Sequence, residues 1–108
     1  MQEIDVTEAK RRLEQPSPPR LIDVREPDEW EVCHIKGAEL LPLSQWPNLI
    51  REKLTNPAEP LLIYCHHGSR SARATQFLML QKFTDATNIA GGIDAWSLDV
   101  DSTVARYE

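Results

Sequence analysis

The chain has 108 residues, of which 41% are hydrophobic and 27% are charged, and its formal net charge is -5 at pH 7. These values are typical of one compact soluble domain and exclude a largely disordered chain. The net negative charge disfavours nucleic-acid binding, which needs a positive field, and no apolar run approaches the roughly 18–20 residues of a membrane span. The acidic N-terminus lacks the apolar core of a signal peptide. We therefore expect a cytoplasmic single domain over residues 1–108, with a tail from about residue 99.

The first part of the chain predicts a helix, a strand and a second, short helix. Apolar residues at helical spacing predict a helix over residues 6–14, with Asp5 as its N-cap and Glu8 at the spacing of a capping box. A short β-branched run predicts a strand at residues 21–24. Residues 26–30 are typical of a turn that leads into a short helix.

The middle of the chain predicts two further strands with a helix between them. Residues 39–41 predict a strand, and the next apolar residues predict a main helix over residues 45–54 with Ser44 as its N-cap. Residues 61–64 form a continuous apolar run, which is typical of a parallel strand buried on both faces. A polar loop at residues 65–70 follows this strand directly.

The last third predicts a helix at residues 71–82, a strand at 86–89 and a helical turn at 93–97. The alternation of strands and helices predicts an α/β domain with a largely parallel sheet. In such sheets, functional residues gather at the carboxyl ends of the strands. The junction that begins at Cys65 is the one strand–loop–helix connection with chemical character.

The loop after the buried strand has the features of an anion-binding nucleophile site. Cys65 lies where the strand ends, and Gly68 gives the loop the freedom to curl tightly before the next helix. A curled loop at a helix N-terminus points backbone N–H groups inward, which binds anions and favours the thiolate form of a cysteine. Arg70 adds a fixed positive charge and a two-pronged donor for an oxyanion. The alternative is a buried, inert cysteine.

Two chemistries use such a thiolate, namely the transfer of sulfane sulfur and the transfer of a phosphoryl group. The spacing Cys-x4-Arg gives a six-residue loop from Cys65 to Arg70. A persulfide has a single terminal sulfur to surround, so a small ring suffices, whereas related phosphatases hold a phosphoryl group in a longer loop. A phosphatase also needs a carboxylic acid to protonate its alkoxide leaving group, while sulfite leaves without one. Loop length therefore favours sulfur transfer.

Three segments, in order, resemble the rhodanese family and together cover nearly the whole chain. They are LIDVREPDEW at 21–30, continued by HIKGA at 34–38 and Pro-Leu at 42–43, then CHHGSRS at 65–71, then NIAGGIDAW at 88–96. The resemblance implies a rhodanese-like three-layer α/β domain with a five-stranded sheet flanked by helices on both sides. It also implies a thiosulfate:cyanide-type sulfurtransferase in which Cys65 carries sulfur as a persulfide.

The same resemblance indicates the residues of the site, with Cys65 as the catalytic residue. The residues expected to bind the substrate and the persulfide are those of the loop, His66, His67, Gly68, Ser69, Arg70 and Ser71. Arg70 is expected to brace the loop as much as to touch the substrate. Asp23 and Arg25 are expected to support the site as a structural ion pair, and catalysis by these two residues is the less favoured alternative.

Two positions depart from the pattern of the family. Cys33 stands where the family usually has glycine, and it is either a free cysteine without function, which we favour, or a resolving thiol. His66 and His67 stand where members specialised for thiosulfate often carry lysine or arginine. Because imidazoles are largely neutral near pH 7, we expect weaker attraction of thiosulfate, and another persulfide or a carrier protein as physiological donor. The alternative for both histidines is an exposed position in the loop without function.

The predicted reaction is a double displacement in which Cys65 takes sulfur from a small anionic donor such as thiosulfate and gives it to a thiophilic acceptor. The acceptor is cyanide in an assay and a thiol, small or on a protein, in the cell. The alternatives are a persulfide carrier without free turnover, a phosphatase or arsenate-type enzyme, and a binding domain, which the presence of Cys65 disfavours. No cofactor, nucleic acid or membrane is expected, and the cysteine and histidine spacings match no zinc signature.

Overall fold

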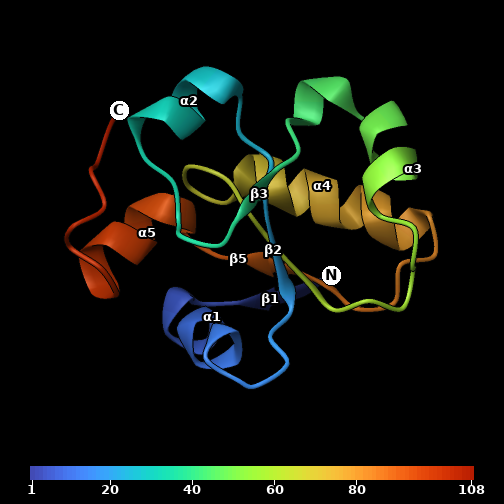
Figure 1. The fold of residues 1–108 in the computed structure, drawn as a ribbon, viewed down its shortest axis with the longest axis horizontal. Coiled ribbons are helices and arrows are strands. Elements are labelled where there is room, and N and C mark those ends of the chain that lie inside the picture. Colours follow the sequence, from blue (N-terminus) through green and yellow to red (C-terminus); the bar gives the residue numbers. More distant parts are fainter.

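The computed structural model describes residues 1–108 as a five-stranded sheet with helices on both faces (Figure 1). The strands are β1 (Gln2–Ile4), β2 (Arg20–Asp23), β3 (Glu39–Leu40), β4 (Leu61–Tyr64) and β5 (Ala86–Ile89). The helices are α1 (Val6–Leu13), α2 (Pro27–Val32), the 3-10 turn η1 (Leu43–Gln45), α3 (Asn48–Lys53), α4 (Ser69–Leu80) and α5 (Gly92–Asp99). The strands are parallel throughout, in the order β1-β5-β4-β2-β3. The structure confirms the predicted three-layer α/β architecture and parallel sheet.

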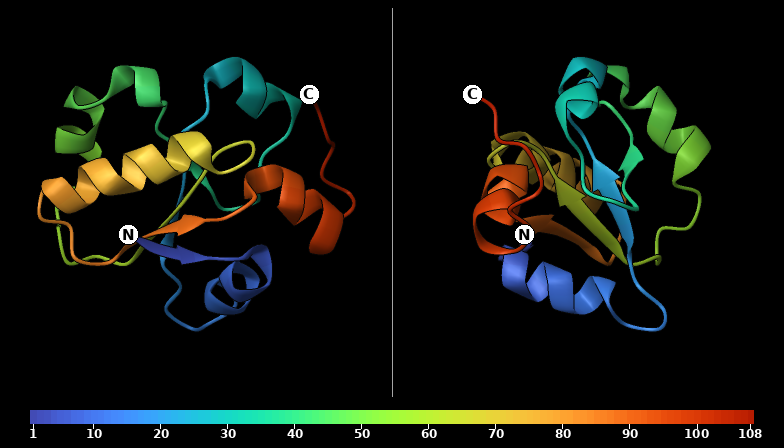
Figure 2. Two further views of the ribbon diagram at one scale, coloured as in Figure 1. Left: turned by 180° about the vertical axis from the view of Figure 1, so that it is seen from behind. Right: turned by 60° about the vertical axis from the view of Figure 1, so that its left-hand side comes forward.

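The central strand β4 divides the core into two halves, because successive side chains of a strand point to opposite faces of its sheet. Leu61 and Ile63 pack with buried residues of α3 and α4, whereas Leu62 and Tyr64 pack with buried residues of α1 and α5. The two pairs of helices lie on opposite sides of the sheet (Figures 1 and 2). Each residue of β4 is buried, as the continuous apolar run predicts.

The main helix predicted over residues 45–54 is wrong in its first half. The chain forms η1 and begins α3 only at Asn48, after Pro47. Proline has no backbone N–H and its ring blocks the preceding turn, so a helix does not continue through this position. Ser44 consequently caps no α-helix, and its hydroxyl donates a hydrogen bond to Glu26 Oε1 at 2.6 Å.

The N-terminal strand β1 is not predicted by the local pattern, although it completes the five strands that the family resemblance implies. It is an edge strand that pairs with β5, where Ile4 lies opposite Ile89. The next residue, Asp5, caps α1 as predicted, because its Oδ1 accepts a hydrogen bond from the Glu8 amide at 2.9 Å. The Glu8 carboxylate does not complete the capping box and instead pairs with arginines of the same helix.

The C-terminal segment returns from α5 toward α2 rather than pointing away from the domain (Figure 1). Ser97 Oγ donates to the Val104 carbonyl at 2.6 Å, and Val104 and Tyr107 pack against the half of the core that contains α5. The segment is therefore part of the folded structure. None of the helices combines the length and the apolar character that would let it cross a membrane.

Candidate active site

Residues 65–71, called the Cys65 loop below, comprise the turn that follows the carboxyl end of β4 and the first residues of α4, which begins at Ser69 rather than at the predicted residue 71. Gly68 precedes α4 with a φ of 113°, a conformation that glycine adopts at little cost. The resulting curl places three donors on Cys65 Sγ: the Gly68 amide at 3.1 Å, the Ser71 amide at 3.4 Å and the Ser71 hydroxyl at 3.3 Å. Cys65 itself is 1% exposed. The structure confirms the predicted curl with inward-pointing amides.

The first residues of α5 hold the base of the Cys65 loop. The Ile93 amide donates to the Cys65 carbonyl at 2.9 Å, and the Asp94 amide donates to the His66 carbonyl at 3.1 Å. This close approach depends on Gly92, whose φ is 59°, because a Cβ at this position would collide with the same two carbonyl oxygens. The segment predicted as a helical turn at residues 93–97 is thus a longer helix, Gly92–Asp99, whose N-terminus positions Cys65.

Arg70 joins the end of the Cys65 loop to α2. Its two terminal nitrogens donate to the Glu29 carboxylate at 2.6 and 2.8 Å. This pair, with a smaller contribution from the Tyr107 hydroxyl, lowers the pKa of Glu29 to about 2. The guanidinium group that we expected to bind an oxyanion is therefore occupied by the Glu29 carboxylate. Through this pair, Arg70 braces the end of the Cys65 loop against α2. Glu29 and Tyr107 were not predicted as site residues.

Asp23 and Arg25 form the predicted structural ion pair beside the loop. Both side chains are fully buried, and Arg25 Nη2 lies 2.6 Å from Asp23 Oδ2. The same guanidinium donates to the Cys33 carbonyl at 2.7 Å and to the Tyr107 hydroxyl at 2.9 Å. Arg25 and Arg70 are thus each neutralised by an acid. The donors directed at the sulfur are the loop amides and the Ser71 hydroxyl rather than a free cation.

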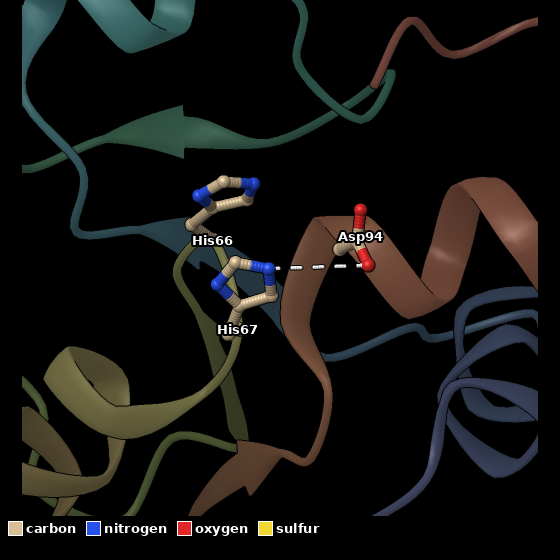
Figure 3. Close-up of side chains that lie close together, drawn as sticks. All are labelled: His66, His67 and Asp94. Atoms are coloured by element: carbon tan, nitrogen blue, oxygen red, sulfur yellow. Dashed lines mark ion pairs between the residues drawn. The ribbon is translucent and has the colours of Figure 1, made fainter. Parts of the chain in front are cut away.

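The two histidines of the loop differ in their surroundings (Figure 3). His66 is 9% exposed, and its ring lies between the His67 ring and the Tyr107 ring, with centroid distances of 3.8 and 3.9 Å. Burial, and secondarily the adjacent His67, lowers the pKa of His66 and so favours its neutral form. His67 is exposed and faces Asp94, with 3.9 Å between Nε2 and Oδ2. Of the two histidines that the alternative predicts to be exposed, His67 is exposed and His66 is buried.

His66, His67 and Asp94 each bring a metal-ligating atom within 4.8 Å of the others. Asp94, however, already accepts a hydrogen bond from Arg106 Nε at 2.9 Å, so its negative charge is compensated. The two imidazole rings are stacked with centroids 3.8 Å and planes 27° apart, so the ring faces rather than the nitrogen lone pairs are directed at one another. This geometry is that of a polar rim of the loop, and we assign no metal to it.

A parallel α/β sheet with a cysteine cradled by a six-residue loop defines a rhodanese fold, and the comparisons with known proteins agree. Residues 5–99 match the rhodanese-like domain family, to which this chain belongs. The chain is 31% identical over 93 residues to the thiosulfate sulfurtransferase GlpE of Vibrio cholerae, an alignment that covers 86% of this chain and 85% of that protein.

Two further relatives show the extent of the likeness. The chain is 36% identical over 113 residues to the rhodanese-like/PpiC domain-containing protein 12, chloroplastic, of Arabidopsis thaliana; this alignment includes 99% of the chain but spans only 38% of the plant protein. Among solved structures, a rhodanese-like domain protein from Staphylococcus aureus matches with a TM-score of 0.83 and 30% identity, with both chains fully covered. The comparisons thus extend over the whole fold, including the Cys65 loop.

Proposed function

We propose that this chain is a sulfurtransferase in which Cys65 carries sulfane sulfur as a persulfide. The observation that carries the proposal is the set of three hydrogen bonds that Cys65 Sγ receives from Gly68 and Ser71 inside the Cys65 loop. Donors in this position stabilise negative charge on sulfur. The name of the bacterial relative, a thiosulfate sulfurtransferase, supports the same reaction class.

In the first half of the reaction, the Cys65 thiolate attacks the outer sulfur of thiosulfate. The S–S bond of thiosulfate breaks, its electron pair leaves with sulfite, and the Cys65 persulfide remains. The amides of Ser69 and Arg70, in the first turn of α4, have no hydrogen-bond partner within the chain. They are available for the terminal sulfur of the persulfide or for the oxygens of the departing sulfite.

In the second half, the acceptor attacks the terminal sulfur and the Cys65 thiolate leaves. The acceptor is cyanide in an assay and a thiol, small or on a protein, in the cell. The Ser71 hydroxyl lies 3.3 Å from Cys65 Sγ and 3.2 Å from the Gly68 carbonyl oxygen, and it has one proton to share between them. Turning this proton toward the sulfur stabilises the leaving thiolate, so Ser71 serves both halves of the cycle.

A second candidate is a persulfide carrier that is loaded by a partner protein. One observation favours it, because Arg25 and Arg70 are both paired with carboxylates and burial favours the neutral form of His66, so none of these three residues offers thiosulfate a free positive charge. A carrier would form the same persulfide but would turn over thiosulfate slowly in the absence of its partner.

Steady-state formation of thiocyanate from thiosulfate and cyanide tests the first candidate. Parallel double-reciprocal lines are expected, since the two substrates react in separate steps. Cys65→Ser should abolish turnover, and the matched substitution Cys33→Ser should leave it unchanged. Turnover that survives Cys65→Ser would contradict the assignment, whereas slow turnover that a protein persulfide donor accelerates would favour the carrier.

An aryl phosphate, supplied to the same enzyme preparation, separates sulfur transfer from phosphatase chemistry. We expect no hydrolysis, because the six-residue loop suits one terminal sulfur.

We further propose that the protein works in the cytoplasm, where a reducing environment keeps both cysteines free, as they are in the structure.

A further inference from the structure

Asn88, a residue of β5, connects the Cys65 loop to the edge strand β1. The residue is 1% exposed, and its Nδ2 donates to the Gly68 carbonyl oxygen at 3.3 Å and to Glu3 Oε2 at 2.8 Å. Both partners are acceptors only, so the nitrogen of the side-chain amide, and not its oxygen, faces them. The two N–H groups of Asn88 Nδ2 are therefore both used, one on the loop and one on β1.

The Gly68 carbonyl oxygen has more donors around it than lone pairs to receive them. A carbonyl oxygen has two lone pairs. Three donors lie within reach: the Ala72 amide at 3.0 Å, the Ser71 hydroxyl at 3.2 Å and the Asn88 side-chain amide at 3.3 Å. The Ser71 hydroxyl also has another acceptor, Cys65 Sγ at 3.3 Å. When the two amides occupy the carbonyl, the hydroxyl proton is left for the sulfur.

The side chain of Asn88 occupies its buried position at a cost to the fold. Its Oδ1 is buried and has no hydrogen-bond partner within the chain. A buried acceptor without a partner destabilises the folded state, and an apolar side chain of similar size would avoid that cost. Without Asn88, the Gly68 carbonyl would keep the Ala72 amide, and the exposed Glu3 carboxylate would be solvated. An asparagine at this position is therefore better explained by its donor than by its packing.

We propose that Asn88 is a positioning residue of the active site, which occupies the Gly68 carbonyl and thereby directs the Ser71 hydroxyl proton to Cys65 Sγ. Asn88 makes no hydrogen bond to the sulfur, so it acts through Ser71. Its part in catalysis rests on the proposed function, because this proton stabilises the thiolate that attacks the sulfur donor and later leaves the persulfide. The thiolate itself is measurable without any sulfur transfer.

Alkylation of Cys65 by iodoacetamide, measured as a function of pH, reports the thiolate. In a Cys33→Ser background Cys65 is the single thiol, and the midpoint of its alkylation profile can be compared among variants. Asn88→Leu removes the donor and nearly keeps the volume, and Asn88→Ala is a second variant at the same position. Thr87→Val is the matched control, because Thr87 is equally buried on the opposite face of β5 and donates to Gln2 Oε1 of β1 at 2.9 Å.

Both Asn88 variants should shift the midpoint upward by about 0.5 to 1 pH unit, which corresponds to about one net hydrogen bond to the thiolate. Thr87→Val should leave the midpoint unchanged. An unchanged midpoint in both Asn88 variants, or an equal shift in Thr87→Val, would overturn the proposal. Failure of both Asn88 variants to fold would show that the residue is needed for stability and would overturn it as well.

A double-mutant comparison with Ser71→Ala tests whether the effect passes through the hydroxyl. Ser71→Ala alone should raise the midpoint by a similar amount, and a substitution of Asn88 in that background should add nothing further. A shift that stays the same size without the Ser71 hydroxyl would overturn the proposal. The expected midpoints in a wild-type protein that forms no thiocyanate would support the role of Asn88 and contradict the proposed function alone.

Discussion

Gly92 lies so close to the Cys65 carbonyl that its missing side chain is what allows α5 to hold the active-site loop. Gly92→Ala should lower thiosulfate turnover by about tenfold to a hundredfold, since displacement of a nucleophile by roughly 1 Å costs about this much. Gly37→Ala is the matched control, because Gly37 also has a positive φ but no atom near an added Cβ. Both substitutions place alanine at a backbone position with positive φ, but only Gly92→Ala adds a steric collision. Chemical denaturation of the two variants therefore measures the loss of stability that the collision adds to the backbone strain. Equal losses of stability and activity in the two variants would contradict this account.

The ion pair between Arg70 and Glu29 should respond to the shape of the cation as well as to its charge. Arg70→Lys keeps the charge but loses the fork that binds both carboxylate oxygens, so we expect lower turnover and a loss of about 1 kcal/mol in stability. Arg73→Lys, at an exposed position of the same helix, should change neither. Turnover and urea denaturation of the two variants provide the comparison. Wild-type values for Arg70→Lys would show that bracing by Glu29 is unimportant.

Acid should weaken the same ion pair. The pKa of Glu29 is lowered from 4.5 to about 2, chiefly by the hydrogen bonds from Arg70, so the folded state favours the charged carboxylate. The stabilisation is fully present above pH 4.5 and is lost as the pH falls toward 2. Wild type should therefore be more stable than Glu29→Gln near neutral pH, and the difference should shrink across this interval. Urea denaturation at several pH values measures it, and a difference that is independent of pH would exclude the proposed linkage.

The buried pair of Asp23 and Arg25 should matter far more for stability than the exposed pairs. Arg25→Met leaves the Asp23 charge buried without a partner, and we expect a loss of about 3–5 kcal/mol. Arg12→Met removes a partner of Glu8 on the surface of α1 and should cost less than about 1 kcal/mol. Thermal and chemical denaturation of the two variants tests the contrast. A cost for Arg25→Met as small as that for Arg12→Met would contradict the importance of this buried pair.

Local sequence pattern predicts the elements of this fold better than it predicts their contacts. The β4 strand and the curl at Gly68 follow from a continuous apolar run and one glycine, both of which are local signals. Strand β1 is short and polar, and its pairing with β5 is distant in sequence, so no pattern within the segment predicts it. Glu29 is 41 residues from Arg70, and Tyr107 is in a tail with few apolar residues. Their part in the site follows from tertiary packing alone.

The family resemblance supplied what the local pattern could not. It implied a fifth strand, an arginine that braces the loop, and an ion pair between Asp23 and Arg25, and the structure contains each of them. It did not imply Tyr107, whose hydroxyl binds Arg25 and Glu29 and which lies beyond the matched segment.

The central claim, that Cys65 carries sulfur as a persulfide, is tested most directly by the intact mass of the protein after incubation with thiosulfate and removal of excess reagent. The account predicts a gain of one sulfur atom, present in wild type and in Cys33→Ser, absent in Cys65→Ser, and reversed by cyanide. A folded protein with a free Cys65 thiol that gains no sulfur from thiosulfate or from a protein persulfide would contradict it.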